Sequence, residues 1–369
     1  MMDNDTIYLP VDVLHAFMID TFKAQGVTDE DARICADILI ASDLRGIESH
    51  GVGRLKYYYD RIQAGVQFPT AQMEIVSDEG ATALIDGHHG MGHPTAYRAM
   101  KLAIEKARQY GLGAVAVRNT THFGIAGYYP LMAVQEGMMG FTVTNARPSI
   151  TPTFGAEPML GTNPIAFAAP SDMEYPFCFD GATSICQRGK IEVADRAGKP
   201  IPEGWVISSE GELLTDPAQI LVDLGKDKAA LLPLGGAGEL FAGYKGYGLA
   251  TMVEILCASL SNGAFLKDLL GFAPDGSRRP FMVGHFFLAI DIAHFIPLEI
   301  SRKVTGDIMR GLQAAHKAPG HDRIYVAGEK EFENEKRVRT QGVPVNANLR
   351  KELQTMRDAL GIAGYEAYF

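Results

Sequence analysis

The spacing of hydrophobic residues changes along the chain, and each change predicts a different kind of structure. Between residues 9 and 65, apolar side chains recur every three or four positions, which is typical of helices with one buried face. Helices are expected at 11–23, 28–44 and 55–62. Gly26 ends the first helix, and Thr28 begins the second with an acidic capping pattern. This region shows no strand pattern.

From residue 72 onward, short apolar runs alternate with amphipathic segments. The expected strands are 73–76, 83–86, 112–117, 139–145, 165–169 and 177–180, and the expected helices are 97–110 and 125–135. Strands that alternate with helices predict an α/β sheet with crossover connections. Six prolines between Pro148 and Pro176 predict that the first part of residues 146–190 is loop.

The final third of the chain mixes charged and apolar stretches. Residues 191–240 are charged, contain glycine and proline, and carry the only tryptophan, Trp205. They are interpreted as a surface flap or a loop on the substrate side. Helices at 246–261, 297–316 and 345–361 and a strand at 286–292 are expected in the remainder. The charged run from Gly328 to Arg339 is interpreted as a solvated surface segment.

Size, charge and cysteine content narrow the class of protein. A chain of 369 residues exceeds the roughly 250–300 residues at which single cores stop growing. A formal net charge of −10 without a basic block argues against nucleic acid or an anionic membrane as the main partner. The most apolar late stretch, 281–295, is too short to span a bilayer. The acidic N-terminus shows no signal peptide pattern, and four cysteines without CxxC spacing favour a reducing cytoplasm.

The stretch from Arg45 to Arg54 holds the densest group of chemically active side chains. His50 has an ordinary pKa near ~6.5, so it can exchange a proton at neutral pH. Arg54 lies one helical turn along the same face if Gly51 opens a helix, and its planar group can hold a carboxylate with two hydrogen bonds. This combination suits chemistry on a small 2-oxo or 2-hydroxy acid. The alternative is a polar helix start that Ser49 caps.

The chain contains no dinucleotide-binding fingerprint after a strand. Neither G-x-G-x-x-G in that context nor the P-loop pattern is present, and Gly243–Gly248 has a different spacing. Any nicotinamide cofactor is therefore not held in the usual Rossmann way. His122 follows the expected strand at 112–117, and such strand ends bind ligands in open α/β sheets. A plain β-α turn is the alternative there. The histidines between residues 88 and 93 predict no metal site, because Pro94 interrupts any helix.

Two further turns carry polar side chains. Gly161–Pro164 offers a hydroxyl and an amide, although Asn-Pro is itself a turn signal. The strand that ends at Asp180 is followed by two hydroxyls and then by Lys190. These groups could orient a cofactor and tune a proton donor. Alternatively, Asp180 could only cap the following helix.

Together these segments resemble the malate/L-lactate dehydrogenase family of the second type. This family also holds ureidoglycolate, sulfolactate and diketogulonate oxidoreductases and the piperideine-carboxylate reductases. The segments that carry the resemblance are Ser49-His-Gly with Arg54, Thr121-His-Phe-Gly with Gly127-Tyr, Gly161-Thr-Asn-Pro164, Asp180-x-Ala-Thr-Ser184 with Gly189-Lys190, and Gly243-Tyr-Lys-Gly-Tyr-Gly-Leu249. They occur in order over about residues 10 to 345, which is nearly the whole chain.

The resemblance implies an α/β, non-Rossmann fold of the malate/L-sulfolactate dehydrogenase kind. In such a fold, residues 1–71 with 296–369 are expected to form a helical domain that makes the dimer. Residues 72–295 are expected to form a mixed-sheet domain that binds the cofactor, with 191–240 on the substrate side. The resemblance also implies a homodimer or a larger homo-oligomer with its active site near a subunit interface.

The same resemblance assigns roles to individual residues. His50 is expected to be the catalytic proton donor and acceptor, with Ser49 as its hydrogen-bonded neighbour and Lys190 as a further catalytic residue. Arg54 is expected to bind the substrate, together with His122. The residues expected on the cofactor side are His122, Thr162, Asn163, Phe179, Asp180, Leu232, Pro233, Gly328, Glu329 and Lys330. No metal ligand is expected.

The resulting hypothesis is a cytoplasmic enzyme that moves a hydride reversibly between NAD and a small 2-hydroxy acid, with malate as the first choice. NADP stays open, because the ribose site cannot be located without a Rossmann landmark. The alternative substrates are lactate, ureidoglycolate, sulfolactate, a diketo sugar acid or a cyclic imine. Lys190 argues against the imine, since the resemblance implies an aspartate near that position in imine reductases. A non-catalytic binding protein is disfavoured, because Ser49, His50, Arg54, His122 and Lys190 are all present.

Overall fold

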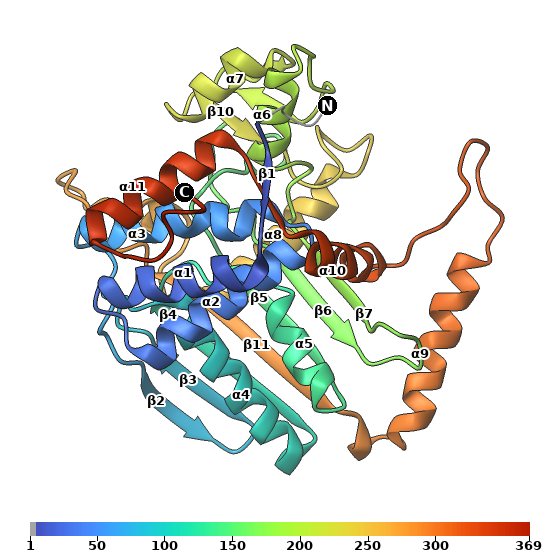
Figure 1. The fold of residues 1–369 in the computed structure, drawn as a ribbon. Coiled ribbons are helices and arrows are strands. Elements are labelled where there is room, and N and C mark those ends of the chain that lie inside the picture. Colours follow the sequence, from blue (N-terminus) through green and yellow to red (C-terminus); the bar gives the residue numbers. More distant parts are fainter. Residues whose placement is uncertain (1–4) are drawn as a thin grey trace.

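A seven-stranded mixed sheet forms the centre of the computed structural model, which describes residues 5–369 and leaves the acidic residues 1–4 outside (Figure 1). Its strand order is β2-β3-β4-β11-β5-β6-β7. The strands are β2 (Glu74–Glu79), β3 (Thr82–Asp86), β4 (Leu112–Thr120), β11 (Val283–Asp291), β5 (Met138–Thr144), β6 (Ile165–Ala169) and β7 (Phe177–Gly181). Only β3 and β4 pair in parallel. The predicted crossover is therefore confirmed there, whereas β11 lies between β4 and β5 and pairs antiparallel with both.

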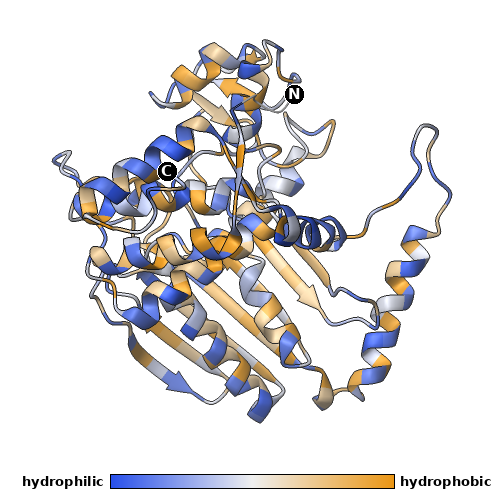
Figure 2. Cartoon of the chain, viewed as in Figure 1, coloured by the Kyte–Doolittle hydropathy of each residue, from blue (hydrophilic) through white to orange (hydrophobic). Residues whose placement is uncertain are grey.

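Helices cover both faces of this sheet. On one face lie α4 (Gly92–Tyr110) and α5 (Tyr128–Gln135), and on the other lies α8 (Gly243–Ala258) (Figure 1). The apolar side chains of β4 and β11 that face α4 and α5 are fully buried, among them Val115, Val117 and Phe287. Figure 2 shows these strands as the most hydrophobic layer of the molecule, as expected for a sheet that is covered on both sides.

A helical unit packs over one end of the sheet. It consists of α1 (Val11–Ala24), α2 (Asp29–Leu44), α3 (Leu55–Gln63) and α11 (Ala347–Leu360), which share one apolar core. The predicted cap of α2 is confirmed, since the Thr28 hydroxyl accepts the N–H of Asp31 (3.2 Å). Residues 9–65, for which no strand was predicted, share only Leu9 with a strand. β1 (Ile7–Leu9) pairs with β12 (Val343–Val345), and a three-residue strand is too short to leave a periodic pattern.

Residues 191–240 form a small folded unit, so the prediction of a flap or loop is wrong for their local structure. The elements are α6 (Arg188–Arg196), β8 (Val206–Ser208), β9 (Leu213–Leu214), α7 (Pro217–Leu224) and β10 (Ala229–Leu231). The three strands form an antiparallel sheet, and the unit has its own apolar core around Ile191, Val206 and Ile220. Its strands have only two or three residues, which explains why the sequence pattern did not reveal them.

The two helices before α11 differ in their surroundings. The charged run from Gly328 forms α10 (Glu329–Gln341). Most of its side chains are exposed or half-buried, as predicted for a solvated surface segment, whereas Glu329 and Val338 are buried. α9 (Leu298–Gln313) extends along one side of the molecule, away from the sheet (Figure 1). Short helices η3 (Leu266–Leu270) and η4 (Ile292–His294) complete the described chain. Among residues 5–369, no helix is both long and apolar enough to cross a membrane.

Candidate functional site

Two consecutive 3-10 turns, η1 (Glu48–His50) and η2 (Val52–Arg54), carry the first candidate residues. Side chains from the end of α2 fix these turns. The Ser42 hydroxyl donates to the Ile47 carbonyl (2.7 Å), and the Asp43 carboxylate accepts the N–H of Val52 (2.8 Å). Burial raises the pKa of Asp43 to about 8. Gly51 is the N-cap of η2, and η2 runs directly into α3, so the helix after Gly51 begins as a 3-10 turn and becomes α-helical at Leu55.

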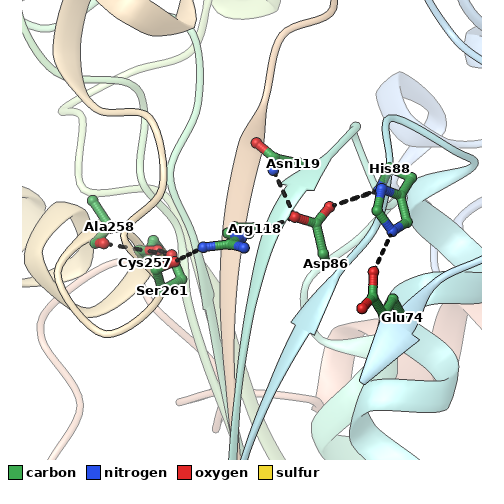
Figure 3. A network of polar contacts seen from close by, with 8 residues as sticks. All are labelled: Glu74, Asp86, His88, Arg118, Asn119, Cys257, Ala258 and Ser261. Carbon is green, nitrogen blue, oxygen red and sulfur yellow. Dashed lines mark hydrogen bonds and ion pairs between the residues drawn. The ribbon is translucent and has the colours of Figure 1, made fainter. Parts of the chain in front are cut away.

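The second candidate turn follows β4, as predicted, and a polar network at the strand ends shapes it. In Figure 3, the Asp86 carboxylate lies among Arg118, Asn119 and His88 and accepts a hydrogen bond from each of them. Asn119 and His88 both have a left-handed backbone, with φ of 50° and 45°. This conformation is uncommon outside glycine, and here the carboxylate holds both residues in place. The network therefore sets the path of the chain into Thr121 and His122.

The start of α4 lies directly against this turn. The N–H of Gly92 donates to the Thr121 hydroxyl (3.0 Å), which in turn donates to the Gly90 carbonyl. A side chain at position 92 would overlap the carbonyl oxygens of Thr121 and His122. Only glycine permits this approach, which brings the helix N-terminus to the candidate histidine.

The structure brings His50 and His122 together, although 72 positions separate them in the sequence. Their rings are stacked with centroids 5.4 Å apart, and both side chains are half-buried. His50 Nδ1 lies 2.9 Å from the Ser49 hydroxyl, in agreement with the predicted pairing. If Nδ1 donates its hydrogen to Ser49, the lone pair of Nε2 is free to accept a proton.

Hydrogen bonds around His122 define which of its nitrogens carries hydrogen. The backbone N–H of Gly124 points at Nδ1 (3.3 Å), so that nitrogen is an acceptor. The hydroxyl of Tyr58, which is fully buried in α3, lies 2.6 Å from the same atom and donates to it. Nε2 of His122 therefore carries the hydrogen and can donate it to a ligand oxygen.

Both imidazoles are neutral near pH 7. Burial, and secondarily the charge of Arg54, lower the pKa of His50 to about 4. Burial and the same arginine also hold the pKa of His122 well below its ordinary value. A neutral His50 can accept a proton, and a neutral His122 can donate a hydrogen bond without adding charge.

Arg54 completes this group. Its guanidinium carbon lies 5.0 Å from the ring centroid of Tyr57, and its Nε is buried without a hydrogen-bond partner in the described chain. An arginine is rarely left in this way unless an anion binds it. The geometry thus combines a proton acceptor, a neutral donor and an arginine with a free hydrogen-bonding edge.

Lys190 lies across a large cleft from the histidine turn. A cavity of about 1110 Å³ separates α6 and Trp205 from η1 and α11, and both Lys190 and Ser49 line it. Neither His50 nor His122 lines this cavity. Lys190 is exposed, with its Nζ 6.0 Å from the Trp205 ring centroid. The structure therefore places this predicted residue in the same cleft as Ser49 and gives it no hydrogen bond to His50.

The turns around Thr162 and Pro233 meet, as a shared cofactor site requires. Thr183 N donates to the Thr162 carbonyl (2.9 Å), and Ser184 forms a β-bridge with Pro233. Leu232 and Pro233 are buried. Asn163 Oδ1 and Ser184 Oγ are buried without a partner within residues 5–369. Such orphaned polar atoms fit a site for a polar cofactor.

Asp180 links this region to the histidines. Its Oδ2 accepts the N–H of Gly127 (2.7 Å), in the turn that follows His122. The alternative reading as a helix cap is wrong, since α6 has Gln187 at its N-cap and no side-chain hydrogen bond there. Phe179, its neighbour in β7, is exposed at 44%. Phe179 and Asp180 therefore lie at the end of β7 that is near the turn after His122.

Gly328–Lys330 lie at the other end of β7. The Cys178 N–H donates to the Ala327 carbonyl (3.2 Å), which fixes the start of α10 beside the strand. Glu329 is buried, and its carboxylate accepts the N–H of Val326 (3.0 Å), whereas Lys330 is exposed. The length of β7 separates this group from the Thr162 turn.

Sequence reasoning missed three residues that shape the site: Tyr58, Tyr57 and Asp43. The tyrosines occupy the apolar face of a helix, where a core role is the ordinary interpretation. Asp43 lies at the end of an amphipathic helix, and only its partner Val52 reveals its role. Within residues 5–369, no group of three or more potential ligands has the arrangement of a metal site.

Comparisons with known proteins show the family of this chain. The family model described as malate/L-lactate dehydrogenase matches residues 9–354. The chain is 44% identical to malate dehydrogenase of Pyrococcus horikoshii over 363 residues, which cover 98% of this chain and 98% of that protein. Its structure is similar to the crystal structure of malate dehydrogenase from Entamoeba histolytica, with a TM-score of 0.93, 43% identity and coverage of 97% and 99% of the two chains. It is also similar to sulfolactate dehydrogenase from Methanocaldococcus jannaschii, with a TM-score of 0.86, 36% identity and coverage of 96% and 98%.

Proposed function

Because the chain belongs to the malate/L-lactate dehydrogenase family, we propose that it oxidises malate reversibly with a nicotinamide cofactor. The observation that carries this proposal is the stacked pair of neutral imidazoles beside an arginine with a free edge. A 2-hydroxy acid needs a base at its hydroxyl group and a cation at its carboxylate. His50 and Arg54 supply these two groups, and His122 adds a hydrogen-bond donor.

Each of these residues has one step in the proposed mechanism. Arg54 binds the substrate carboxylate with its free edge, and Nε2–H of His122 donates to the reacting oxygen. Nε2 of His50 accepts the hydroxyl proton, while Nδ1–H of the same ring keeps its hydrogen bond to the Ser49 hydroxyl. Lys190, from the facing wall of the cleft, adds positive charge on the substrate side. The bound nicotinamide supplies the hydride chemistry, and the protein supplies orientation and charge.

NAD is the proposed cofactor. Asn163 Oδ1 and Ser184 Oγ, two buried atoms without a hydrogen-bond partner in the described chain, would bind its polar groups together with Thr162 and Asp180. Leu232, Pro233, Phe179 and Gly328–Lys330 would line the rest of the site. Among the relatives, a sulfolactate dehydrogenase is named for NADP and a ureidoglycolate dehydrogenase for NAD, so the family accommodates both cofactors.

A substrate panel tests this proposal. Oxaloacetate, pyruvate, sulfopyruvate, a diketo sugar acid and a cyclic imine would each be supplied with NADH and with NADPH, and nicotinamide oxidation would be followed by absorbance. The highest kcat/KM is expected for oxaloacetate with NADH. A higher kcat/KM for another compound would identify that compound, and not oxaloacetate, as the preferred substrate. If a titration showed no cofactor binding at all, the non-catalytic alternative would be favoured.

Removing the Tyr58 hydroxyl tests the assigned hydrogen position on His122. Tyr58→Phe keeps the packing but removes one of two donors to Nδ1, so kcat/KM for malate should fall by about tenfold. The loss should be mainly in kcat, because the carboxylate clamp is untouched. Tyr59→Phe, a neighbour on the same helix, is the control and should behave like the wild type. Equal activity of both variants would contradict the assignment.

We also propose that the enzyme is a homodimer or a larger homo-oligomer, formed in part through α9. This helix and the segment just before it expose a row of large apolar residues at every fourth position. In Figure 2 the helix stands away from the body of the molecule. The row is Ile296, Ile300, Val304, Ile308 and Leu312, each at least 42% exposed. Exposed apolar patches of this kind mark interfaces. The opposite side of α9 is held by Arg310, which pairs with Asp172.

Charges placed in this row should dissociate the oligomer. Val304→Asp with Ile308→Asp should reduce the mass measured by light scattering to the 40.0 kDa of one chain, because two carboxylates cannot be buried in an apolar interface without partners. Lys303→Ala, on the polar side of the same helix, should leave the mass unchanged. An unchanged mass for the double variant would exclude α9 from the interface.

The proposed compartment is the cytoplasm. All four cysteines are buried free thiols, which fits a reducing environment.

A further inference from the structure

Arginines gather around one tyrosine of α3, beside the histidine pair. The ring centroid of Tyr57 lies 6.1 Å from that of His122. The guanidinium carbons of Arg54 and Arg61 lie 5.0 Å and 5.7 Å from the same tyrosine ring. Arg147 adds a third positive charge, and together these arginines oppose the rise that burial causes in the pKa of Tyr57. In an acidic protein, this is a local concentration of positive charge.

Arg61 has no counter-charge in the described chain. Its Nε and Nη2 are buried without a hydrogen-bond partner, and its guanidinium carbon lies 3.7 Å from the Phe281 ring centroid. Burial lowers the pKa of Arg61, and the nearby Arg278 lowers it further. A buried guanidinium without a partner is costly, so it is expected where an anion binds. The stack on Phe281 fixes the plane of the guanidinium and limits how it can turn.

The helical register places this arginine on the same side as the substrate residues. Arg54 is the N-cap of α3, and Tyr57 and Arg61 follow it within the helix at spacings of three and four positions, so the three side chains are expected on one side. Both guanidinium groups lie close to one ring, at 5.0 Å and 5.7 Å from its centroid, so we expect a small diacid to reach both. Arg54 is already assigned to the carboxylate next to the reacting carbon. The second arginine is therefore available for the distal end of such a substrate.

We propose that Arg61 is a second anion clamp, which binds the distal anionic group of a dianionic 2-hydroxy acid. This inference rests on the proposed function and specifies its substrate class: a dicarboxylate such as malate, or a carboxylate with a sulfonate. The proton transfer and the carboxylate next to the reacting carbon do not involve Arg61. Its loss should therefore affect dianionic substrates and spare monoanionic ones.

The kinetic test compares malate with 2-hydroxybutanoate, which has a methyl group in place of the distal carboxylate. Arg61→Met keeps the packing on Phe281 but removes the charge. It should lower kcat/KM for malate by tenfold or more, mainly through KM, and change the value for 2-hydroxybutanoate by less than about twofold. Arg61→Lys should recover part of the loss. Arg33→Met, an exposed arginine of α2, is the control for net charge. Equal losses for both substrates would overturn the proposal.

A binding test keeps this inference independent of turnover. Succinate should raise the melting temperature of the wild type more than butanoate does, and Arg61→Met should abolish the difference. Titration with NADH distinguishes the other anion that could use this arginine, a cofactor phosphate. If Arg61→Met weakened NADH binding and left the succinate effect intact, the assignment to the substrate would be overturned. If the wild type oxidised no 2-hydroxy acid but bound succinate through Arg61, only the proposed function would fail.

Discussion

Replacing His50 by alanine is expected to lower the turnover of malate by about 10²–10⁴-fold, the usual contribution of a general base. The ring accepts the hydroxyl proton, and none of the residues assigned to the site can replace it: His122 already carries its hydrogen on the nitrogen that faces the ligand. The affinity for NADH, measured by nicotinamide fluorescence, should stay within about twofold, because the polar cofactor residues lie on other turns. Stopped-flow measurement of a single turnover would separate the chemical step from product release.

A matched control defines the limits of this result. His321→Ala removes an exposed histidine outside the site and should leave turnover unchanged. If His50→Ala retained near-normal turnover, the assignment of the base would be wrong. If it lost cofactor binding and turnover together, the histidine would have a structural role in the cofactor site.

Adding one methyl group to Gly51 should disable the same turn without touching a catalytic side chain. A Cβ atom at this position would overlap the buried carboxylate of Asp43, which accepts the N–H of Val52. Either the carboxylate or the turn must move, and both His50 and Arg54 would be displaced. A misplacement of about 1 Å can cost about 10² in rate. Gly51→Ala should therefore lower kcat/KM by about that factor and also lower the melting temperature, since overpacking costs about 1–3 kcal/mol.

Gly53→Ala is the matched control, two residues further along the same turn. Gly53 is exposed, and the nearest atom to an added Cβ would be the Glu48 carbonyl oxygen at 3.4 Å. Its activity should stay within about twofold of the wild type. If the two variants behaved alike, the packing of Asp43 against the turn would not control the geometry of the site.

Local patterns were sufficient for most elements of the fold. The apolar spacing predicted α1, α2 and α3 to within one or two residues of their ends, because each buries one face against the same core. The local patterns could not predict that β11 lies between β4 and β5. Strand order depends on pairing between segments far apart in sequence, and β11 has the same apolar composition as its neighbours. The unit at 191–240 was missed for the opposite reason, since its strands are too short for any period.

The candidate site was predictable where one residue type has few other uses. A histidine and an arginine in a glycine-rich turn suggest chemistry, and the structure brings His50, Arg54 and His122 together. Tyr58 could not be recognised, because a tyrosine on a helical apolar face is normally a core residue. Its contact with His122 spans 64 positions and exists only in the folded chain. The catalytic role of Lys190 was assigned from the resemblance, and it stays a prediction.

The central claim is that a hydride passes between the hydroxyl-bearing carbon of malate and the nicotinamide at this site. The most direct test uses malate labelled with deuterium on that carbon, incubated with NAD and the wild-type enzyme, with the NADH analysed by mass spectrometry. The proposed function predicts one deuterium on the nicotinamide ring in every NADH formed, and almost no NADH from His50→Ala. Unlabelled NADH, or no NADH from the wild type, would contradict it.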